Sequence, residues 1–546
     1  MKDFRKYCIV ILAAAFLGCL IPACEQADMV TGRVVDENGP VPGAVVRVKT
    51  SDNHTLTDEL GDFILPGVSL PVTITAWADG YFVGWSYTDN ETDNLTITLK
   101  PYYTSDNHDY DWFSLEGADG SQSCGHCMPS FPEWAEDAHA QSAVNPRFLT
   151  MYNGTDVQGN QSPLTRYIHV KDYGILPLAP DPNRPYYGPG YKLDFPDTAG
   201  NCSACHVPAM AAHPGMAYGA DPNDAEGIEL EGVFCEFCHK IGDVTIDEET
   251  GMPYPNMPGV LSMRLFRPDE GQQLFFGNFD DVTRRVSYLP LIEESAFCAP
   301  CHYGTFWDVE IYNSFGEWLD SPYSDPLTGQ TCQDCHMPAV DYNYFVYPEK
   351  GGHYRNPERI SSHLMPGAAD EAFLRDAVTM DLAARLDNAS VQVDVTITND
   401  NTGHHVPTDS PLRHMILLVE AVDGDNESLL QTGGPTVPEW AGIGEPADGY
   451  YAGLPGKAFA KILEESWTGI SPTGSYWNLT HIVSDNRLAA FEADTSSYGF
   501  TAAGPDFITV KATLVFRRAF IELVDQKGWE LQDIVMSQQQ VTLQQN

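Results

Sequence analysis

A five-residue pattern, Cys-x-x-Cys-His, occurs four times between residues 202 and 336 and constrains this chain more than any other feature. The four copies are Cys202-Ser-Ala-Cys205-His206, Cys235-Glu-Phe-Cys238-His239, Cys298-Ala-Pro-Cys301-His302 and Cys332-Gln-Asp-Cys335-His336. The composition predicts only about 0.009 such matches by chance. Two thiols at this spacing attach a porphyrin through its vinyl groups, and the adjoining imidazole binds iron on one face. We therefore expect four covalently bound c-type haems.

Zinc sites and disulfides also use paired cysteines. A zinc site combines two Cys-x-x-Cys units and needs no histidine directly after each one. Disulfides form in exported proteins but leave the four adjoining histidines unexplained. The spacing adds a further expectation, because 33 residues separate Cys202 from Cys235 and 34 separate Cys298 from Cys332. This spacing predicts two closely packed haem pairs joined into a chain.

A fifth cysteine pair, Cys124-Gly-His126-Cys127-Met128, has methionine in place of the final histidine. Three interpretations stay open. A haem is attached there with Met128 or a distant histidine as axial ligand, or it has an open position, or the two cysteines form a disulfide without haem. Methionine ligation would raise the reduction potential relative to bis-histidine haems, and an open position would permit catalysis. The haem count is therefore four or five.

Second axial ligands must come from the histidines outside the motifs, which are twelve of the 16 in the chain. His139 lies on an expected short helix after the atypical motif, and His213 follows the first complete motif by seven residues. His353 and His363 follow the last motif. All four are candidate haem ligands, and the alternative for each is a surface or hydrogen-bonded histidine.

The chain is too long for one ordinary hydrophobic core, and changes in its residue pattern along the sequence divide it into three parts. Residues 28–102 contain short alternating runs between turn signals and predict a small β-sandwich. Residues 103–368 hold the ten motif cysteines and few long periodic elements, which is typical of an irregular or α-helical domain with haem filling its interior. Residues 369–546 predict a second β-sandwich, with alternating runs at 391–398 and 507–516 and a short helix near 369–386.

The N-terminal module contains two recognisable stretches of sequence. Residues 32–46 read Gly-Arg-Val-Val-Asp-Glu-Asn-Gly-Pro-Val-Pro-Gly-Ala-Val-Val, and residues 57–63 read Thr-Asp-Glu-Leu-Gly-Asp-Phe. This text resembles the carboxypeptidase regulatory-like domain. The resemblance implies a spacer or adhesion module without catalytic residues, and we expect a spacer that holds the redox part away from a membrane.

The first 24 residues read as an export signal. Lys2, Arg5 and Lys6 precede an apolar run at residues 9–17 that is too short for a permanent membrane span. Cys19, in Phe-Leu-Gly-Cys, fits lipid attachment better than Cys24, which follows Pro22-Ala23. Secretion without a lipid is the alternative. We expect a periplasmic, outer-membrane or cell-surface location, with membrane contact only through the lipid.

The motif region resembles the multihaem cytochromes related to the tetrahaem cytochrome c of nitrifying bacteria. The matching text is Glu133-Trp134, Ala138-His139-Ala140, Glu231 to Lys240, Phe297 to His302, Gly316 to Tyr323, Thr331 to Pro338, Ser362-His363, Asn399 to Thr408 and Pro411-Leu-Arg413. The resemblance implies that His139 and His363 are distal ligands. It also implies that His404 or His405 approaches a haem or braces the β-domain. Met128 departs from the family pattern.

These observations favour an electron carrier over a catalyst. Irons saturated by two protein ligands exchange electrons but cannot bind substrate. The alternative is an oxidoreductase that converts a small nitrogen or sulfur compound at the Cys124–Cys127 haem, and a third, weaker hypothesis is an adhesive protein. The formal net charge of −46 disfavours nucleic acid as a partner. We expect redox partners such as other cytochromes or a quinol-linked reductase, or identical subunits.

Overall fold

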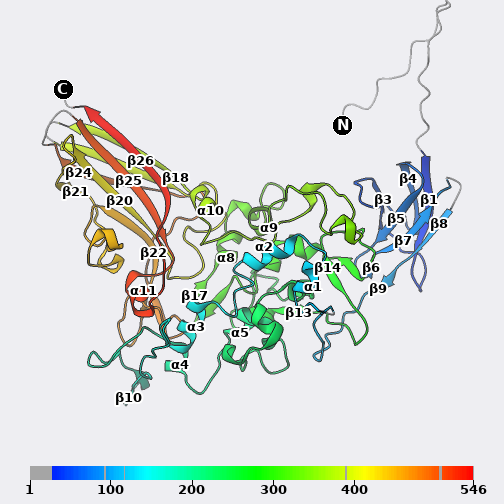
Figure 1. The fold of residues 1–546 in the computed structure, drawn as a ribbon, viewed down its shortest axis with the longest axis horizontal. Coiled ribbons are helices and arrows are strands. Elements are labelled where there is room, and N and C mark those ends of the chain that lie inside the picture. Colours follow the sequence, from blue (N-terminus) through cyan, green and yellow to red (C-terminus); the bar gives the residue numbers. More distant parts are fainter. Residues whose placement is uncertain (1–27, 91–93, 116, 388–389, 503–506, 545–546) are drawn as a thin grey trace, which may run out of the picture. The chain divides into compact units, whose positions relative to one another are not determined.

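The chain folds into two structural units, and it changes from one unit to the other after Ala76, after Val83 and after Leu99. The computed structural model describes residues 28–90, 94–115, 117–387, 390–502 and 507–544 (Figure 1). The first unit holds the described residues up to Ala76 together with Gly84–Leu99, and the second holds Trp77–Val83 and Lys100 onward. The expected export signal and Cys19 lie outside the described residues. No helix in the described ranges is long and apolar enough to cross a membrane.

The first unit consists of two small sheets, as its alternating runs predict. One has the order β4-β1-β8 and the other β3-β2-β5-β7. The strands are β1 Asp28–Val35, β2 Val45–Val48, β3 His54–Leu56, β4 Asp62–Val68, β5 Val72–Trp77, β7 Gly84–Thr88 and β8 Asn94–Thr98. Gly32 in β1 is required because a Cβ there would lie 2.4 Å from the carbonyl oxygen of Leu95 and 2.7 Å from the Phe63 ring.

Residues 103–368 consist of short helices and small hairpins. No helix described in this stretch exceeds the eight residues of α3. The helices are α1 Gln122–Gly125, α2 Ser130–Glu136, α3 Pro146–Asn153, α4 Tyr191–Asp194, α5 Ser203–His206, α6 Pro208–Ala211, α7 Cys235–Cys238, α8 Ser314–Leu319 and α9 Cys332–His336. Eight 3-10 helices cover Pro222–Asp224, Gly227–Glu231, Gly259–Ser262, Pro290–Glu293, Ser295–Phe297, Pro322–Ser324, Pro348–Lys350 and Pro357–Arg359 in the described chain.

Five two-stranded sheets lie in this region and directly before it in the described chain. They pair β6 Tyr81–Phe82 with β9 Lys100–Pro101, β10 Tyr167–Val170 with β11 Gly174–Pro177, β12 Ile241–Val244 with β13 Met263–Leu265, β14 Phe275–Gly277 with β15 Val286–Tyr288, and β16 Gly304–Phe306 with β17 Val309–Tyr312. The buried hydrophobic clusters of this region are small, and one of them consists of Trp134, Ala140, Ala209, Phe234, Phe237, Ile241 and Leu265. A haem-filled interior stays a prediction for this region.

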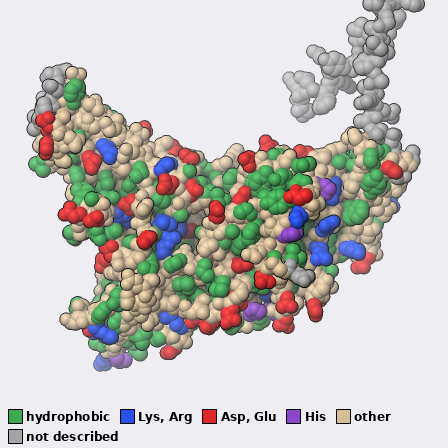
Figure 2. Space-filling model, viewed as in Figure 1, with side chains coloured by type: hydrophobic (Ala, Val, Ile, Leu, Met, Phe, Trp, Pro, Cys, Tyr) green, Lys and Arg blue, Asp and Glu red, His purple; other side chains and the backbone are tan. Residues whose placement is uncertain are grey.

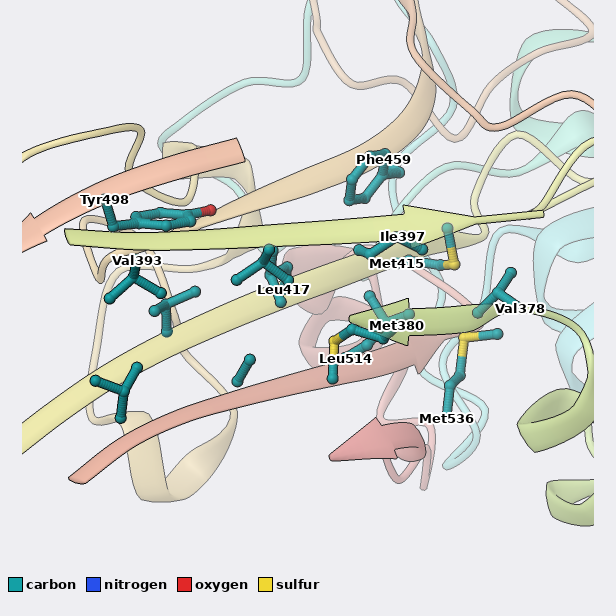
Figure 3. Packing of buried hydrophobic residues seen from close by; sticks show 14 of the residues in the cluster. Val378, Met380, Val393, Ile397, Met415, Leu417, Phe459, Tyr498, Leu514 and Met536 are labelled. Atoms are coloured by element: carbon teal, nitrogen blue, oxygen red, sulfur yellow. The ribbon is translucent and has the colours of Figure 1, made fainter. Parts of the chain in front are cut away.

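Two larger sheets form the C-terminal part, with the orders β18-β19-β24-β21 and β23-β22-β20-β25-β26. Their strands are β18 Thr379–Asp387, β19 Ser390–Thr398, β20 His414–Asp423, β21 Gln431–Gly433, β22 Gly456–Glu465, β23 Thr480–Asp485, β24 Ala493–Thr501, β25 Phe507–Arg517 and β26 Ile534–Gln544. The remaining elements are α10 Glu371–Asp376, α11 Ile521–Lys527 and two 3-10 helices, Glu439–Ala441 and Pro446–Asp448. Figure 3 shows Val393, Ile397 and Tyr498 of one sheet with Met415 and Leu417 of the other in one buried cluster.

The expected helix near 369–386 is wrong in its second half. Asp370 caps α10 by accepting a hydrogen bond from the backbone N–H of Phe373 at 2.7 Å. The helix ends at Asp376, and residues 379–387 form strand β18. Met380 is buried, and Leu382, Ala384 and Leu386 pack against the same core. This period-two packing against β19 overrides the helical propensity of the alanine and leucine residues.

The C-terminal part is attached to the motif region through buried polar contacts. The Lys527 ammonium at the end of α11 is fully buried and donates to the carbonyls of Thr150, Thr155 and Pro189 at 3.0, 3.0 and 2.5 Å. Three donors on one ammonium match three backbone acceptors. The β-sheets and the cysteine motifs therefore belong to one folded unit.

Candidate haem sites

Each complete motif forms a single helical turn. The backbone N–H of the motif histidine donates to the carbonyl of the first cysteine at 3.1 Å in His206, His239 and His302. Side chains three and four positions apart lie on the same face of such a turn, so two thiols and one imidazole project together. In the atypical motif the N–H of Met128 donates to Cys124 at 3.0 Å in the same way. The fifth motif thus has the backbone geometry of the other four, with a thioether in the place of the imidazole.

None of the ten motif cysteines forms a disulfide in this structure, so Cys124 and Cys127 are not joined to each other. Zinc coordination has no support either, because the described residues offer no group of three or more His, Cys, Asp or Glu side chains placed to hold a metal ion. Burial raises the pKa of the Cys202 and Cys238 thiols to about 12.

Thiols of different motifs contact one another. Three pairs of thiols from different motifs lie close enough to shift each other's pKa, namely Cys124 and Cys235, Cys205 and Cys301, and Cys298 and Cys332. The motif of Cys298 and Cys301 therefore touches two others. The neighbouring thiols of Cys298 and Cys332 agree with the spacing-based expectation of one close pair. The expected pairing of the Cys202 motif with the Cys235 motif differs, because Cys205 neighbours Cys301 and Cys235 neighbours Cys124.

Three of the four motif histidines face a second histidine. The pairs and the distances between ring centres are His139 with His302 at 6.1 Å, His239 with His363 at 6.4 Å, and His336 with His404 at 6.3 Å. Two nitrogens bound in line to one metal lie about 2 Å from it, and each ring centre lies about 1.1 Å further out. Such a metal separates the ring centres by about 6.2 Å. The three pairs fit bis-imidazole ligation of iron.

The hydrogen bonds of these rings fit the same role. Five imidazoles place Nδ1 against a backbone carbonyl: His206 on Ser142 at 3.2 Å, His239 on Phe276 at 2.5 Å, His336 on Pro366 at 2.8 Å, His363 on Ser361 at 3.1 Å and His404 on His405 at 2.9 Å. Because a carbonyl only accepts, Nδ1 carries the proton and Nε2 keeps its lone pair. Burial lowers the pKa of His206, His239 and His336 to about 4, so these imidazoles are neutral at pH 7.

The remaining two candidate ligands use carboxylates instead. His139 Nδ1 lies 2.6 Å from Asp137, and His302 Nδ1 lies 3.2 Å from Asp409. A third carboxylate, Glu133 of α2, positions the loop of His363 by accepting its backbone N–H at 2.7 Å and the Ser362 hydroxyl at 3.2 Å. Partners of this kind orient metal-bound imidazoles.

His206 differs from the other motif histidines. Its ring lies flat against Phe148, with ring centres 3.8 Å apart and planes at 1°. A metal bound to Nε2 lies in the plane of the imidazole, so Phe148 covers a face of the ring and does not oppose the metal. No second imidazole is in ring contact with His206 in the described part of the chain. The side opposite His206 therefore has no evident imidazole ligand.

The predicted distal histidines fall into two groups. His139 and His363 each face a motif imidazole, as expected of axial ligands. His213 and His353 are exposed, and neither belongs to the three pairs, so their role stays a prediction, as does that of Met128. His404 was named by resemblance only as an alternative to His405, and the geometry distinguishes the two. His405 lies 3.3 Å from Glu317 and is not in a pair.

The comparisons with known proteins agree with these two units. Residues 29–100 match the carboxypeptidase regulatory-like domain family. No curated protein sequence matches this chain. The solved structure of a penta-haem cytochrome c552 from Thermochromatium tepidum is similar with a TM-score of 0.53 and 18% identity, covering 78% of this chain and 98% of that one. A mu homology domain of Danio rerio Fcho1 is matched with a TM-score of only 0.12 and 8% identity over 26% of this chain and 39% of that one.

At 18% identity the likeness to the penta-haem cytochrome shows the fold alone. The relationship to the tetrahaem cytochromes of nitrifying bacteria stays a resemblance of sequence. The N-terminal unit is thus a carboxypeptidase regulatory-like domain, and the larger unit has the fold of a multihaem cytochrome c.

Proposed function

We propose that this chain is an exported multihaem c-type cytochrome that carries electrons along covalently bound haems. The observation that carries the proposal is the set of three imidazole pairs, each 6.1 to 6.4 Å between ring centres with Nε2 free for iron. Each pair contains the histidine of one motif, whose two thiols project from the same turn. Haem bound in this way supplies a one-electron Fe(III)/Fe(II) couple.

Different side chains of the protein would attach the haems, bind their irons and set the distances between them. The cysteine thiols would hold each porphyrin by thioether bonds, and the paired imidazoles would bind its iron and so exclude substrate. Thiol contacts place the motif of Cys298 next to those of Cys332 and Cys202, and the motif of Cys124 next to that of Cys235. Cys238 also raises the pKa of Cys301, which places the Cys235 motif near the Cys298 motif. These neighbouring attachment sites support a continuous electron path through five haems, with Cys124 and Cys127 holding the fifth.

Location and partners are the finer parts of the proposal. The leader supports export and lipid attachment at Cys19, with the regulatory-like domain as a spacer. Figure 2 shows acidic side chains scattered over the face drawn, and the chain carries 76 Asp and Glu against 30 Lys and Arg. Redox partners with basic surfaces, such as another cytochrome or a quinol-linked reductase, would be attracted to this surface.

Haem counting tests the proposal. Protein from a host that matures c-type cytochromes should be red, and its mass should exceed that of the processed chain by about 616 Da for each haem. Ala replacing both Cys124 and Cys127 should remove one haem if the fifth site is occupied, and Ala replacing Cys202 and Cys205 is the matched control that must remove one. A colourless protein would refute the proposal.

A second candidate function is reaction of a small molecule at an open iron. The Phe148 ring stacked on His206 favours the Cys202 motif as a candidate reaction centre, beside the Cys124 motif, where Met128 stands in place of the histidine. Carbon monoxide added to the ferrous protein should bind an open haem and leave bis-imidazole haems unchanged. Carbon monoxide binding that disappears when Cys202 and Cys205 are replaced would support this assignment, and absence of binding would leave electron transfer alone.

A further inference from the structure

The two candidate ligands that donate to carboxylates belong to the same pair. His302 Nδ1 lies 3.2 Å from Asp409, and His139 Nδ1 lies 2.6 Å from Asp137. The other five candidate ligands place Nδ1 on neutral carbonyls. We infer that Asp137 and Asp409 are positioning residues that make the haem of Cys298 and Cys301 the hardest to reduce. This inference rests on the proposed function and adds to it an order of potentials.

The physical reason is the charge on the acceptor. A carboxylate pulls the Nδ1 proton more strongly than a carbonyl does, which makes the imidazole a better donor to iron. Fe(III) carries one more positive charge than Fe(II), so a nearby negative charge stabilises the oxidised form more. Both imidazoles that would bind this iron are polarised by a carboxylate. In the other two pairs, neither imidazole has a carboxylate on Nδ1. The two effects therefore add on the same couple.

Both carboxylates are held in place by further contacts. Asp137 is only 3% exposed in its side chain and also accepts the backbone N–H of His139 at 2.8 Å. Asp409 accepts the hydroxyl of Ser314 at 2.8 Å through its other oxygen. Its backbone has φ of +59°, a left-handed conformation that Asp and Asn tolerate better than most residues. Arg413, 3.9 Å from Asp409, offsets part of that charge. The buried Asp137 acts in a lower dielectric and keeps more of its effect.

The haem of Cys298 and Cys301 would lie between two other haems, so its low reduction potential would affect electron transfer along the chain. Cys301 contacts Cys205, and Cys298 contacts Cys332, so its attachment site lies between two others. When electrons enter the chain, the haems on either side should be reduced first. The middle haem would stay ferric until the potential falls further. Electron transfer to this middle haem is then thermodynamically unfavourable and controls electron exchange between the haems on its two sides.

Two substitutions test this inference in the full haem-loaded protein. Asp409→Asn and Asp137→Asn each keep an oxygen acceptor for the imidazole and remove the charge. Asn also suits the left-handed backbone at position 409. In a potentiometric titration followed by absorbance and electron paramagnetic resonance, each variant should raise the lowest one-electron wave. We expect at least a tenfold rise in the Fe(II)/Fe(III) ratio at a fixed potential, which corresponds to 59 mV.

The control is Asp394→Asn in β19, which makes the same change on a carboxylate that bonds Ser497 and Arg385 instead of a candidate ligand. Both test variants must move the same wave, because both carboxylates act on one iron. Shifts no larger than the control, shifts in two different waves, or a shift in a wave other than the lowest would overturn the inference. Those results leave the haem count intact. A colourless wild-type protein would instead refute the proposed function.

Discussion

Glu317 of α8 joins the motif region to the C-terminal sheets, and its removal should cost measurable stability. One carboxylate oxygen accepts from Arg487 Nη1 at 2.7 Å, and the other accepts from the backbone N–H of His405 at 3.2 Å and from the Thr408 hydroxyl. Burial raises the pKa of Glu317, but the His405 imidazole, the Arg487 guanidinium and the Thr408 hydroxyl outweigh it and lower the pKa from 4.5 to about 2. A difference of about 2.5 pKa units corresponds to about 3 kcal/mol.

The sign of the pH dependence follows from the lowered pKa. The folded state favours the ionised carboxylate, so its contribution is fully present well above pH 4.5 and is lost as the pH falls towards 2. Glu317→Gln resembles the protonated form at every pH. The variant should therefore unfold with a free energy about 3 kcal/mol below the wild type at pH 7, and the difference should shrink to about 1 kcal/mol at pH 3.

Urea unfolding followed by tryptophan fluorescence at the two pH values measures both quantities. Glu420→Gln is the matched control, because Glu420 is 66% exposed and its ion pair with Lys511 spans 4.0 Å. Such an exposed pair contributes at most about 1 kcal/mol. A Glu317→Gln effect equal to the control, or one that does not change between pH 7 and pH 3, would refute the reasoning.

Two further substitutions address the axial ligands and the attachment of α11. His404→Ala should convert one haem from low spin to high spin in electron paramagnetic resonance, because His404 faces His336. His405→Ala is the control and should leave the spin state unchanged. A spin-state change in His405→Ala alone would contradict the assignment of His404 as the ligand. Lys527→Met leaves three backbone carbonyls without their donor and should lower the free energy of unfolding by about 2 to 3 kcal/mol, measured by urea unfolding. Lys511→Met, at an exposed position of β25, should change it by less than about 0.5 kcal/mol.

Local features of the sites were predictable from the sequence, because they depend on residues a few positions apart. The Cys-x-x-Cys-His turn brings two thiols and one imidazole to one face wherever the chain is helical for a single turn. The alternating run at 391–398 corresponds to β19 with every second side chain buried. Segment 379–387 was mispredicted because its composition favours a helix and only its packing against β19 makes it a strand.

Contacts between distant residues were not predictable in this way. Asp409 is 107 positions from His302, and Glu133 is 230 positions from His363. His404 and His405 are adjacent in sequence but have different partners, one facing His336 and the other Glu317. No periodic pattern distinguishes two neighbouring histidines in a loop. The neighbours of the Cys202 and Cys235 motifs were likewise set by chain reversals between cysteines, which spacing does not record.

The C-terminal part of the chain contributes residues to the candidate haem sites and is not an appended module. The loop that leads into β20 supplies both His404, which faces His336, and Asp409, which bonds His302. Asn399 at the end of β19 holds this loop by donating to the carbonyl of His404 at 2.8 Å, and Glu317 of α8 holds its other side. A chain that ended at residue 368 would keep all ten motif cysteines. It would lack one member of an imidazole pair and one of the two carboxylates on which the proposed order of potentials depends.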